Sequence, residues 1–237
     1  MGLNSSSAPK KQKQLPPAGL NLAVCYSIID LGTQEEQFQG KPAAFAQKVH
    51  YSFEFPNLPQ VVFDNAKGPQ PMAIFQEYTV SANEKAKLPK VLSSWGSIPV
   101  KDIKAITPAF LKAFLTQACM LSIAHTPAKT AVDSETQRPI MHAQIAQKGL
   151  AVMPKMADTP KPANIISAVK FLDLDAFDWN VYNSLPQFLQ DKIAKCKEWN
   201  SITMKFPKPV DNSAGAIAPQ GVSPEALAMQ NTGGPSF

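Results

Sequence analysis

Hydrophobic and polar residues alternate along much of the chain between residues 20 and 153, with the period of two that predicts β-strands. The clearest case is 47–55 (QKVHYSFEF), in which every second residue is valine, tyrosine or phenylalanine until Pro56 ends the run. Further strands are predicted at 20–31, 72–80, 118–125 and 140–147, and the last of them continues through 150–153.

Three other segments have the apolar spacing of helices rather than that of strands. The segment 81–95 opens with a Ser-x-x-Glu capping box and is interrupted by Pro89, which predicts a short helix that is either kinked or divided into two pieces. Residues 107–115 predict a short amphipathic helix with proline at its first position. Residues 178–199 predict a C-terminal helix. Its apolar residues, Leu185, Phe188, Leu189 and Ile193, suit packing against the end of a barrel rather than contact with a ligand.

The predicted elements follow the order of three strands, a helical region, two strands and a C-terminal helix. This order predicts a mainly β protein with a five-stranded barrel of the oligonucleotide/oligosaccharide-binding (OB) type, which has a helix between strands three and four. A β-sandwich would need more strands, and a parallel α/β fold would need a helix between all strands.

One folded domain is expected at 19–206, with a polar segment on each side of it. Residues 1–18 are polar, basic and rich in proline, which predicts a disordered arm. Residues 207–237 are rich in proline, glycine and alanine and predict a disordered tail. No apolar run is long enough for a transmembrane helix, so none is expected.

The charged residues argue against sequence-specific recognition of duplex DNA. The net charge of +5 comes from 23 basic and 18 acidic residues, and only one of the basic residues, Arg138, is an arginine. Reading of base edges favours bidentate arginine, whereas lysines suit phosphate contacts without sequence preference. An ordinary mixed surface would have the same balance of charges.

The 3 cysteines lie far apart in the sequence, which fits a reducing, cytosolic compartment and neither a disulfide framework nor a zinc site.

The segment 22–56 (LAVCYSIIDLGTQEEQFQGKPAAFAQKVHYSFEFP) resembles the start of small OB-fold single-stranded-DNA-binding proteins of tailed bacteriophages. The similarity lies in a strand that ends in DLGTQ (30–34), a loop with GK (40–41) and a strand that ends in FEF (53–55). The family's third strand with its connecting helix, its fourth strand and its C-terminal helix are similar, in the same order, to 77–96, 118–126 and 171–193.

The resemblance implies a protein that binds single-stranded DNA without sequence specificity during phage DNA replication or recombination. It implies the cytoplasm of the infected bacterial host as the location, no enzymatic activity, no cofactor and no metal, and it allows a small homo-oligomer. Replication proteins are a further expected partner, through a tail that ends in Phe237. Tails of this kind are commonly acidic, but this one has only Asp211 and Glu225, which weakens the expectation of recruitment.

Binding of single strands without sequence preference requires a basic groove and exposed aromatic rings on which bases stack. The predicted loop between the first two strands (32–46) contains two phenylalanines and a lysine, and in the OB arrangement this loop flanks the groove. The outer faces of strands two and three, strand five and the polar hairpin loop 126–139 complete the predicted interface. The candidate nucleic-acid-binding residues are Phe38, Lys41, Phe45, Lys48, His50, Phe75, Lys129, Arg138 and His142.

These residues also have a structural interpretation. The loop phenylalanines can fold back onto the barrel, and Phe75 fits a second layer of core equally well. Lys48 and His50 fit an ordinary solvent-exposed face, and Asp133 and Glu135 cancel the charge of the hairpin loop. The alternative function is a virion or assembly protein, or a host-interaction protein, that uses an OB-like barrel for protein–protein contact.

Catalytic and metal sites are not expected from the sequence. His50, His125 and His142 lie on three different predicted strands without a close pair. The aspartates at 173–178 lack the glycine and the distal glutamate of a calcium loop. No GxxxxGK[ST] phosphate loop and no GxSxG nucleophile elbow occurs.

Overall fold

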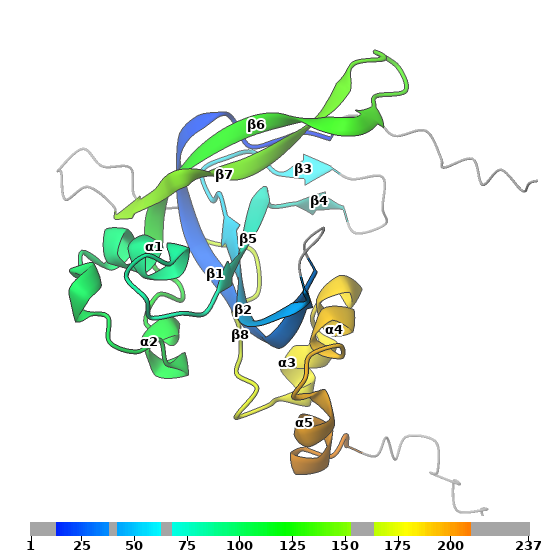
Figure 1. Cartoon of the computed structure of the whole chain (residues 1–237). Helices are drawn as coiled ribbons and strands as arrows, with labels where there is room; N and C mark the ends of the chain where they lie inside the picture. The colour runs from blue at the N-terminus through cyan, green and yellow to red at the C-terminus, as the bar shows by residue number, and fades with distance from the viewer. Residues whose placement is uncertain (1–12, 38–41, 63–67, 153–163, 210–237) are drawn as a thin grey trace, which may run out of the picture.

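The computed structural model describes residues 13–37, 42–62, 68–152 and 164–209. Within these ranges the chain forms a strongly curved sheet, with one group of helices on one side of it and a second, C-terminal group on the other (Figure 1). Most of the predicted arm and tail lies outside the described residues.

Fourteen regular elements make up the described part of the chain. The strands are β1 (Gly19–Glu36), β2 (Ala44–Glu54), β3 (Val61–Val62), β4 (Pro69–Gln70), β5 (Ala73–Thr79), β6 (Ala118–Val132), β7 (Pro139–Val152) and β8 (Lys170–Leu172). The helices are α1 (Lys87–Gly96), α2 (Pro108–Lys112), α3 (Trp179–Asn183), α4 (Gln187–Ile193) and α5 (Trp199–Lys205), with a 3₁₀ turn, η1, at Val100–Asp102.

The main sheet has six strands and is antiparallel except for the pairing of β8 with β1. Its order is β5-β2-β1-β6-β7, and β8 pairs with β1 in parallel at Ser27–Ile29. The prediction of a mainly β protein is confirmed, and each of the five predicted strands corresponds to one strand of this path. β5 and β7 approach each other, but no strand pairing joins them among the described residues, so the sheet is not closed there.

The main core lies inside the curve of the sheet, where α1 covers it. The core face predicted for β2 is confirmed, because Val49, Tyr51 and Phe53 are all buried. The opposite face was expected to be exposed, and this expectation is wrong, because His50, Ser52 and Glu54 are buried too. Trp95 of α1 packs against this row of side chains, with its ring centroid 5.7 Å from that of Phe53. Its indole N–H donates a hydrogen bond of 3.1 Å to the carbonyl of Ala118, so the helix is held to β6 as well.

A bulge in β1 changes which of its residues enter the main core. Strict alternation predicts one face with Leu22, Val24, Tyr26 and Ile28, but Ala23 and Cys25 enter the main core instead. The pairing of β1 with β2 is irregular between Cys25 and Ser27, and this extra residue returns Ile28 to the core face. The predicted face is therefore wrong for the first half of the strand.

A second core lies on the outer side of β1, between this strand and the C-terminal unit, which we define as residues 170–206. Ile29 and Leu31 of β1 are fully buried there. The C-terminal helix predicted at 178–199 is present as separate short helices, because Pro186 precedes the first residue of α4 and a turn follows this helix. The predicted apolar residues Leu185, Leu189 and Ile193 are buried in this second core.

The helix predicted at 81–95 begins later than its capping box suggested. α1 starts at Lys87 with Ala86 at its N-cap, and the Ser81 hydroxyl instead accepts a hydrogen bond of 3.2 Å from the Asn83 N–H. Pro89 consequently falls in the first turn of α1, where its missing N–H costs no helical hydrogen bond. The helix is therefore not divided at this proline and runs as one element from Lys87 to Gly96.

The described end of the N-terminal segment lies against the sheet. Pro16 is buried, and its carbonyl oxygen is 2.8 Å from Nε2 of His125 on β6. An ordered contact therefore begins before residue 19, where the folded domain was predicted to start. None of the described helices is long and apolar enough to span a membrane.

Candidate nucleic-acid interface

The outer face of the β2–β5 pair is the region where the sequence predicted a binding wall. The strand register places Lys48 opposite Thr79, His50 opposite Glu77, and Ser52 opposite Phe75. These residues alternate with the buried core row of β2, so their side chains point away from the main core.

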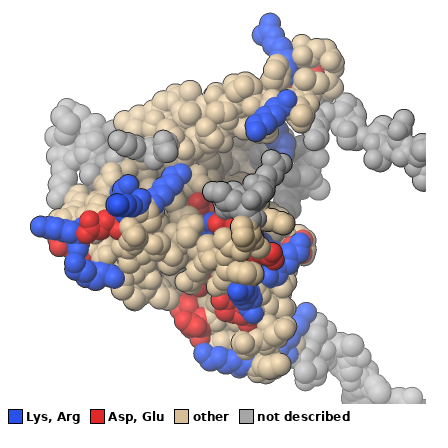
Figure 2. Space-filling model, viewed as in Figure 1, with Lys and Arg blue, Asp and Glu red and all other residues tan. Residues whose placement is uncertain are grey.

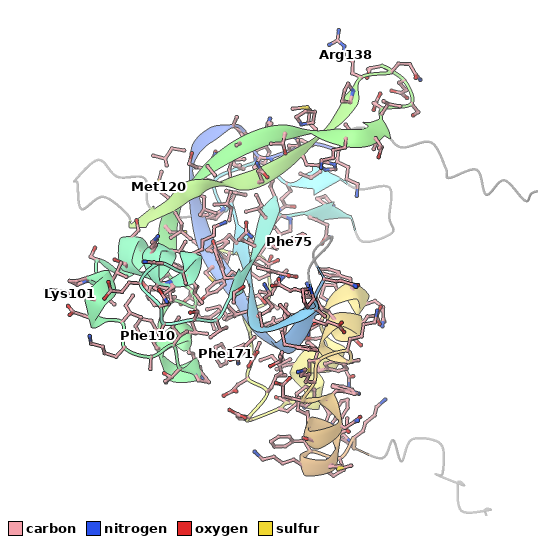
Figure 3. The ribbon with its side chains drawn as sticks, in the orientation of Figure 1. Phe75, Lys101, Phe110, Met120, Arg138 and Phe171 are labelled. Atoms are coloured by element: carbon pink, nitrogen blue, oxygen red, sulfur yellow. The ribbon has the colours of Figure 1, made fainter. Side chains whose placement is uncertain are left out.

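Phe75 is the most exposed aromatic residue for which the structure gives a value. It exposes 60% of its surface, which excludes the alternative that it belongs to a second layer of core. Its ring is stacked on that of His50, with centroids 5.2 Å apart and an angle of 26° between the planes. A ring held against a neighbour, with more than half of the residue in solvent, is available for contact with an unstacked base. Figure 3 shows Phe75 on the outer side of the sheet.

His50 is buried, although an exposed strand face was predicted for it. Only 1% of its surface is exposed, because α4 of the C-terminal unit covers this part of the strand. The Phe188 ring from α4 meets His50 edge-on, with centroids 6.2 Å apart and an interplanar angle of 62°. His50 therefore supports the rings above it and does not itself offer a face to a nucleic acid.

A second part of the chain covers the far end of the same face of β2. Glu54 is completely buried, and its two carboxylate oxygens accept hydrogen bonds of 2.8 Å from the backbone N–H groups of Ile166 and Ser167. These charge-assisted bonds attach the segment before β8 to the sheet. Much of the predicted outer wall of β2 is consequently an internal contact of the protein.

Glu77 connects β5 to the C-terminal unit beside the rings. Its Oε2 lies 2.5 Å from Nζ of Lys192 on α4, and its Oε1 lies 3.8 Å from Nδ1 of His50. The neighbouring His50 and the ammonium group of Lys192 together lower the pKa of Glu77 to about 2. Glu77 is thus ionised at neutral pH and holds Lys192 next to Phe75 and Phe188.

Lys48 lies on the predicted face, but its charge already has a partner. Its Nζ forms an ion pair with Glu36 and donates a hydrogen bond of 2.7 Å to the Thr79 hydroxyl. A phosphate that contacts Lys48 must therefore compete with a carboxylate, and this lowers the affinity that Lys48 can contribute.

Phe45 is exposed, yet the register separates it from the ring pair on β2 and β5. Phe45 pairs with Glu35 of β1. It precedes Lys48 by three residues, and β2 has no bulge between the two, so the side chains of Phe45 and Lys48 lie on opposite faces of the strand. Nζ of Lys197 lies 3.2 Å from the centroid of its ring, in a cation–π contact. The single wall predicted from Phe45 to Phe75 is therefore not continuous.

The remaining candidates lie elsewhere. Phe38 and Lys41 fall outside the described residues. Lys129, Arg138 and His142 are exposed on the β6–β7 hairpin, which extends beyond the rest of the sheet (Figure 1). Arg138, at the tip of this hairpin, is distant from Phe75 (Figure 3).

The charged surface visible in Figure 2 has no continuous basic stripe. Basic side chains occur at the hairpin tip, over the α1–α2 region and over the C-terminal helices, and acidic side chains lie among the last two groups (Figure 2). On this face, the lysines offer separate contacts rather than one groove of high positive potential.

Residues for metal or thiol chemistry are not gathered anywhere in the described part of the chain. No group of three or more histidine, cysteine, aspartate or glutamate side chains is placed to hold a metal ion there. Cys25 and Cys119 are buried in the main core, and burial raises the pKa of both thiols well above the ordinary value.

A small pocket opens between β1, β2 and the segment around α2, and Asp30 lines it. Its Oδ1 accepts a hydrogen bond of 2.8 Å from the N–H of Gly32, and its Oδ2 accepts a longer one from Gln47. Burial outweighs these bonds and raises the pKa of Asp30 to about 6, from an ordinary value of 3.8. The pocket thus contains a carboxylate that is costly to ionise.

The raised pKa makes the stability of the protein depend on pH. The stability that the protein has with Asp30 protonated is fully present below the unfolded-state pKa of 3.8. This stability is lost as the pH rises through the folded-state pKa of about 6, because the buried carboxylate must then ionise. Asp30→Asn keeps an oxygen for Gly32, so we expect it to stabilise the protein at neutral pH by about 2–3 kcal/mol. Urea unfolding between about pH 4.5 and pH 7 measures this difference. The exposed Asp102→Asn is the control, and an identical pH dependence of wild type and Asp30→Asn would contradict the prediction.

Phe188 and Lys192, the α4 residues that contact His50 and Glu77, were not among the sequence candidates. Phe188 was assigned with Leu189 to the buried face of the C-terminal helix, yet it exposes 50% of its surface. The periodic spacing did not separate Phe188 from Leu189, because adjacent positions at the edge of an apolar stripe differ only in which neighbour covers them.

Comparison with known proteins adds no further residue: no family model, no curated protein and no solved structure matches the chain.

Proposed function

We propose that this protein binds single-stranded DNA without sequence specificity. The observation that carries the proposal is the exposed ring of Phe75, stacked on the buried His50 on the outer face of β5. An aromatic ring that a folded protein fixes in solvent is a platform for unstacked bases, and every base has a face that can stack on it.

The order of the strands supports an OB-type arrangement for this function. In the path β5-β2-β1-β6-β7, the long strands in chain order are β1, β2, β5, β6 and β7, and α1 and α2 lie between the third and the fourth. OB folds bind oligonucleotides on the face of strands two and three. Phe75 and His50 belong to those two strands, β5 and β2.

The resemblance of residues 22–56 to phage proteins supports the biological setting of this proposal. We place the activity in DNA replication or recombination, in the cytoplasm of an infected bacterium. The scarcity of arginine supports binding through phosphates and base faces rather than through base edges.

Fluorescence anisotropy with an oligothymidylate of about 30 nucleotides, long enough for a site of about 4–16, tests the proposal. We expect binding to the single strand to exceed binding to a duplex of equal length. The logarithm of affinity should fall with the logarithm of salt concentration, by about 0.7 for each phosphate contact. Phe75→Ala should weaken binding by about 1–3 kcal/mol, or about 5- to 150-fold, because it removes a stacking face.

Leu20→Ala is the matched control, because Leu20 is also an exposed apolar strand residue, at 65%, and lies at the start of β1. It should leave the affinity unchanged. Equal affinity of wild type for duplex and single strand would contradict the proposal. A complete lack of binding would favour the alternative, an assembly or host-interaction protein.

A further inference from the structure

α4 of the C-terminal unit meets the outer face of β2 and β5 at the rings of His50 and Phe75. Phe188 contacts Phe75, with ring centroids 6.0 Å apart and an angle of 37° between the planes. One helical turn later, Lys192 forms the ion pair with Glu77 of β5. The helix is therefore fixed to the strand at two successive points.

The exposure of Phe188 has no explanation in the packing of α4. Its neighbour Leu189 is 3% exposed and Ile193 is fully buried, so the helix already has a complete apolar face toward β1. Phe188 lies outside that face and exposes 50% of its surface. Together with Phe75 it forms a patch of two adjacent rings in solvent, a feature that marks binding surfaces in folded proteins.

We propose that Phe188 is a base-stacking residue, so that α4 and β5 each supply one ring of a two-ring platform for single-stranded DNA. This inference rests on the proposed function and adds the C-terminal unit to the interface. It also revises the expectation that the C-terminal helix is purely structural. The occupant is an unpaired base, because bases inside a duplex are stacked on each other and do not offer their faces to protein rings.

His50 is the positioning residue of this platform. Its ring lies flat against Phe75 and meets Phe188 edge-on, and it is almost fully buried beneath both. Edge-to-face and offset-stacked contacts of this kind hold aromatic rings in fixed orientations. The two exposed rings therefore need not be ordered by the DNA, which reduces the entropic cost of binding.

Lys192 gives the platform a cation next to the rings. It follows Phe188 by four residues on α4, so the two side chains lie on the same side of the helix. Its present partner, Glu77, is a half-buried carboxylate at the edge of the platform. A backbone phosphate of a base stacked on the rings reaches this ammonium group in competition with Glu77, which makes Lys192 a point-charge contact without sequence preference.

Two substitutions of Phe188 in the full-length protein separate stacking from packing. Phe188→Leu keeps an apolar side chain against Phe75 but removes the ring, and Phe188→Trp keeps a ring. We expect Phe188→Leu to weaken binding to oligothymidylate about 5- to 150-fold, and Phe188→Trp to bind about as well as wild type. Thermal unfolding should be nearly the same for all three proteins, because the residue is half exposed.

Photo-crosslinking to an oligonucleotide that contains 5-iododeoxyuridine gives a readout that a structural role would not produce. Peptide mapping should place a crosslink at Phe188, and a crosslink at Phe75 alone would contradict the inference. A double-mutant cycle of Phe75→Leu and Phe188→Leu should lose less affinity than the sum of the single losses, if one base contacts both rings.

The outcomes distinguish this inference from the proposed function. If Phe75→Leu weakens binding but Phe188→Leu does not, the C-terminal unit is not part of the interface and the inference is wrong, while single-strand binding stands. If Phe188→Leu and Phe188→Trp weaken binding equally, the ring does not stack, and the inference is also wrong. If the wild type does not bind single strands, both proposals fail.

Discussion

Replacement of Glu54 by alanine is expected to lower the free energy of unfolding by about 3–6 kcal/mol, because hydrogen bonds to a charged group contribute about 1.5–3 kcal/mol each. The carboxylate is fully buried and accepts hydrogen bonds from the backbone N–H groups of Ile166 and Ser167. Without it, both N–H groups lose their acceptor, and the segment before β8 loses its attachment to β2. Equilibrium unfolding in urea measures the loss.

Two further measurements test the assignment of this loss to the backbone bonds. Glu54→Gln retains one oxygen acceptor, so we expect it to lose about half as much stability as Glu54→Ala. Hydrogen exchange should become faster at the amides of Ile166 and Ser167 in both variants. The exposed Glu84→Ala serves as the control. Unchanged exchange at the two amides in Glu54→Ala would show that the carboxylate does not hold this segment.

Leu189→Ala is expected to cost about 2–5 kcal/mol of stability, as is usual for removal of a buried leucine side chain. Leu189 is 3% exposed and packs in the second core, between α4 and the outer side of β1. Its removal leaves a cavity between α4 and β1. Thermal or urea unfolding detects the loss.

Met204→Ala is the matched control for Leu189→Ala, since Met204 also lies in the C-terminal unit but exposes 83% of its surface. Its replacement should change stability by less than about 0.5 kcal/mol. Equal unfolding midpoints for Leu189→Ala and the wild type would mean that α4 is not packed as described. Because Leu189→Ala leaves Phe75 in place, this variant also shows whether loosening of α4 affects DNA binding.

The strands could be predicted because they depend on local pattern. Along 48–55, apolar and polar residues alternate without interruption, and Val49, Tyr51 and Phe53 of β2 are buried as expected. The alternation of β5 likewise places Phe75 on the face opposite Ile74, but it left open whether that face is exposed or forms a second layer of core. Where one face of a strand is buried, the sequence must record it at every second residue.

The burial of the opposite face of β2 could not be predicted in the same way. His50 is covered by Phe188, which lies 138 positions later in the sequence, and Glu54 is covered at Ile166 and Ser167. No local pattern records such a distant contact. A charged or polar residue on a strand is compatible with solvent and with a buried partner, and only the tertiary arrangement decides between them.

The same limit applies to β1 and to the interface. The irregular pairing near Tyr26 exchanges the two faces of the strand, and a bulge leaves no reliable mark in a run that is apolar on both sides. Phe45 was placed on the wall with Phe75 because both are aromatic and near in the predicted fold. The actual register, with Glu35 opposite Phe45, puts its side chain on the other face.

The position of β1 between two cores has a consequence for the synthesis of the chain. Ile29 and Leu31 are made early, but the residues that cover them begin at Leu172, 141 positions after Leu31. At a translation rate of about 5–20 residues per second, these apolar side chains wait roughly 7–28 s for their partners. The C-terminal unit, which is made after β1 to β7, thus closes the outer side of the first strand, and completion of this second core must wait for it.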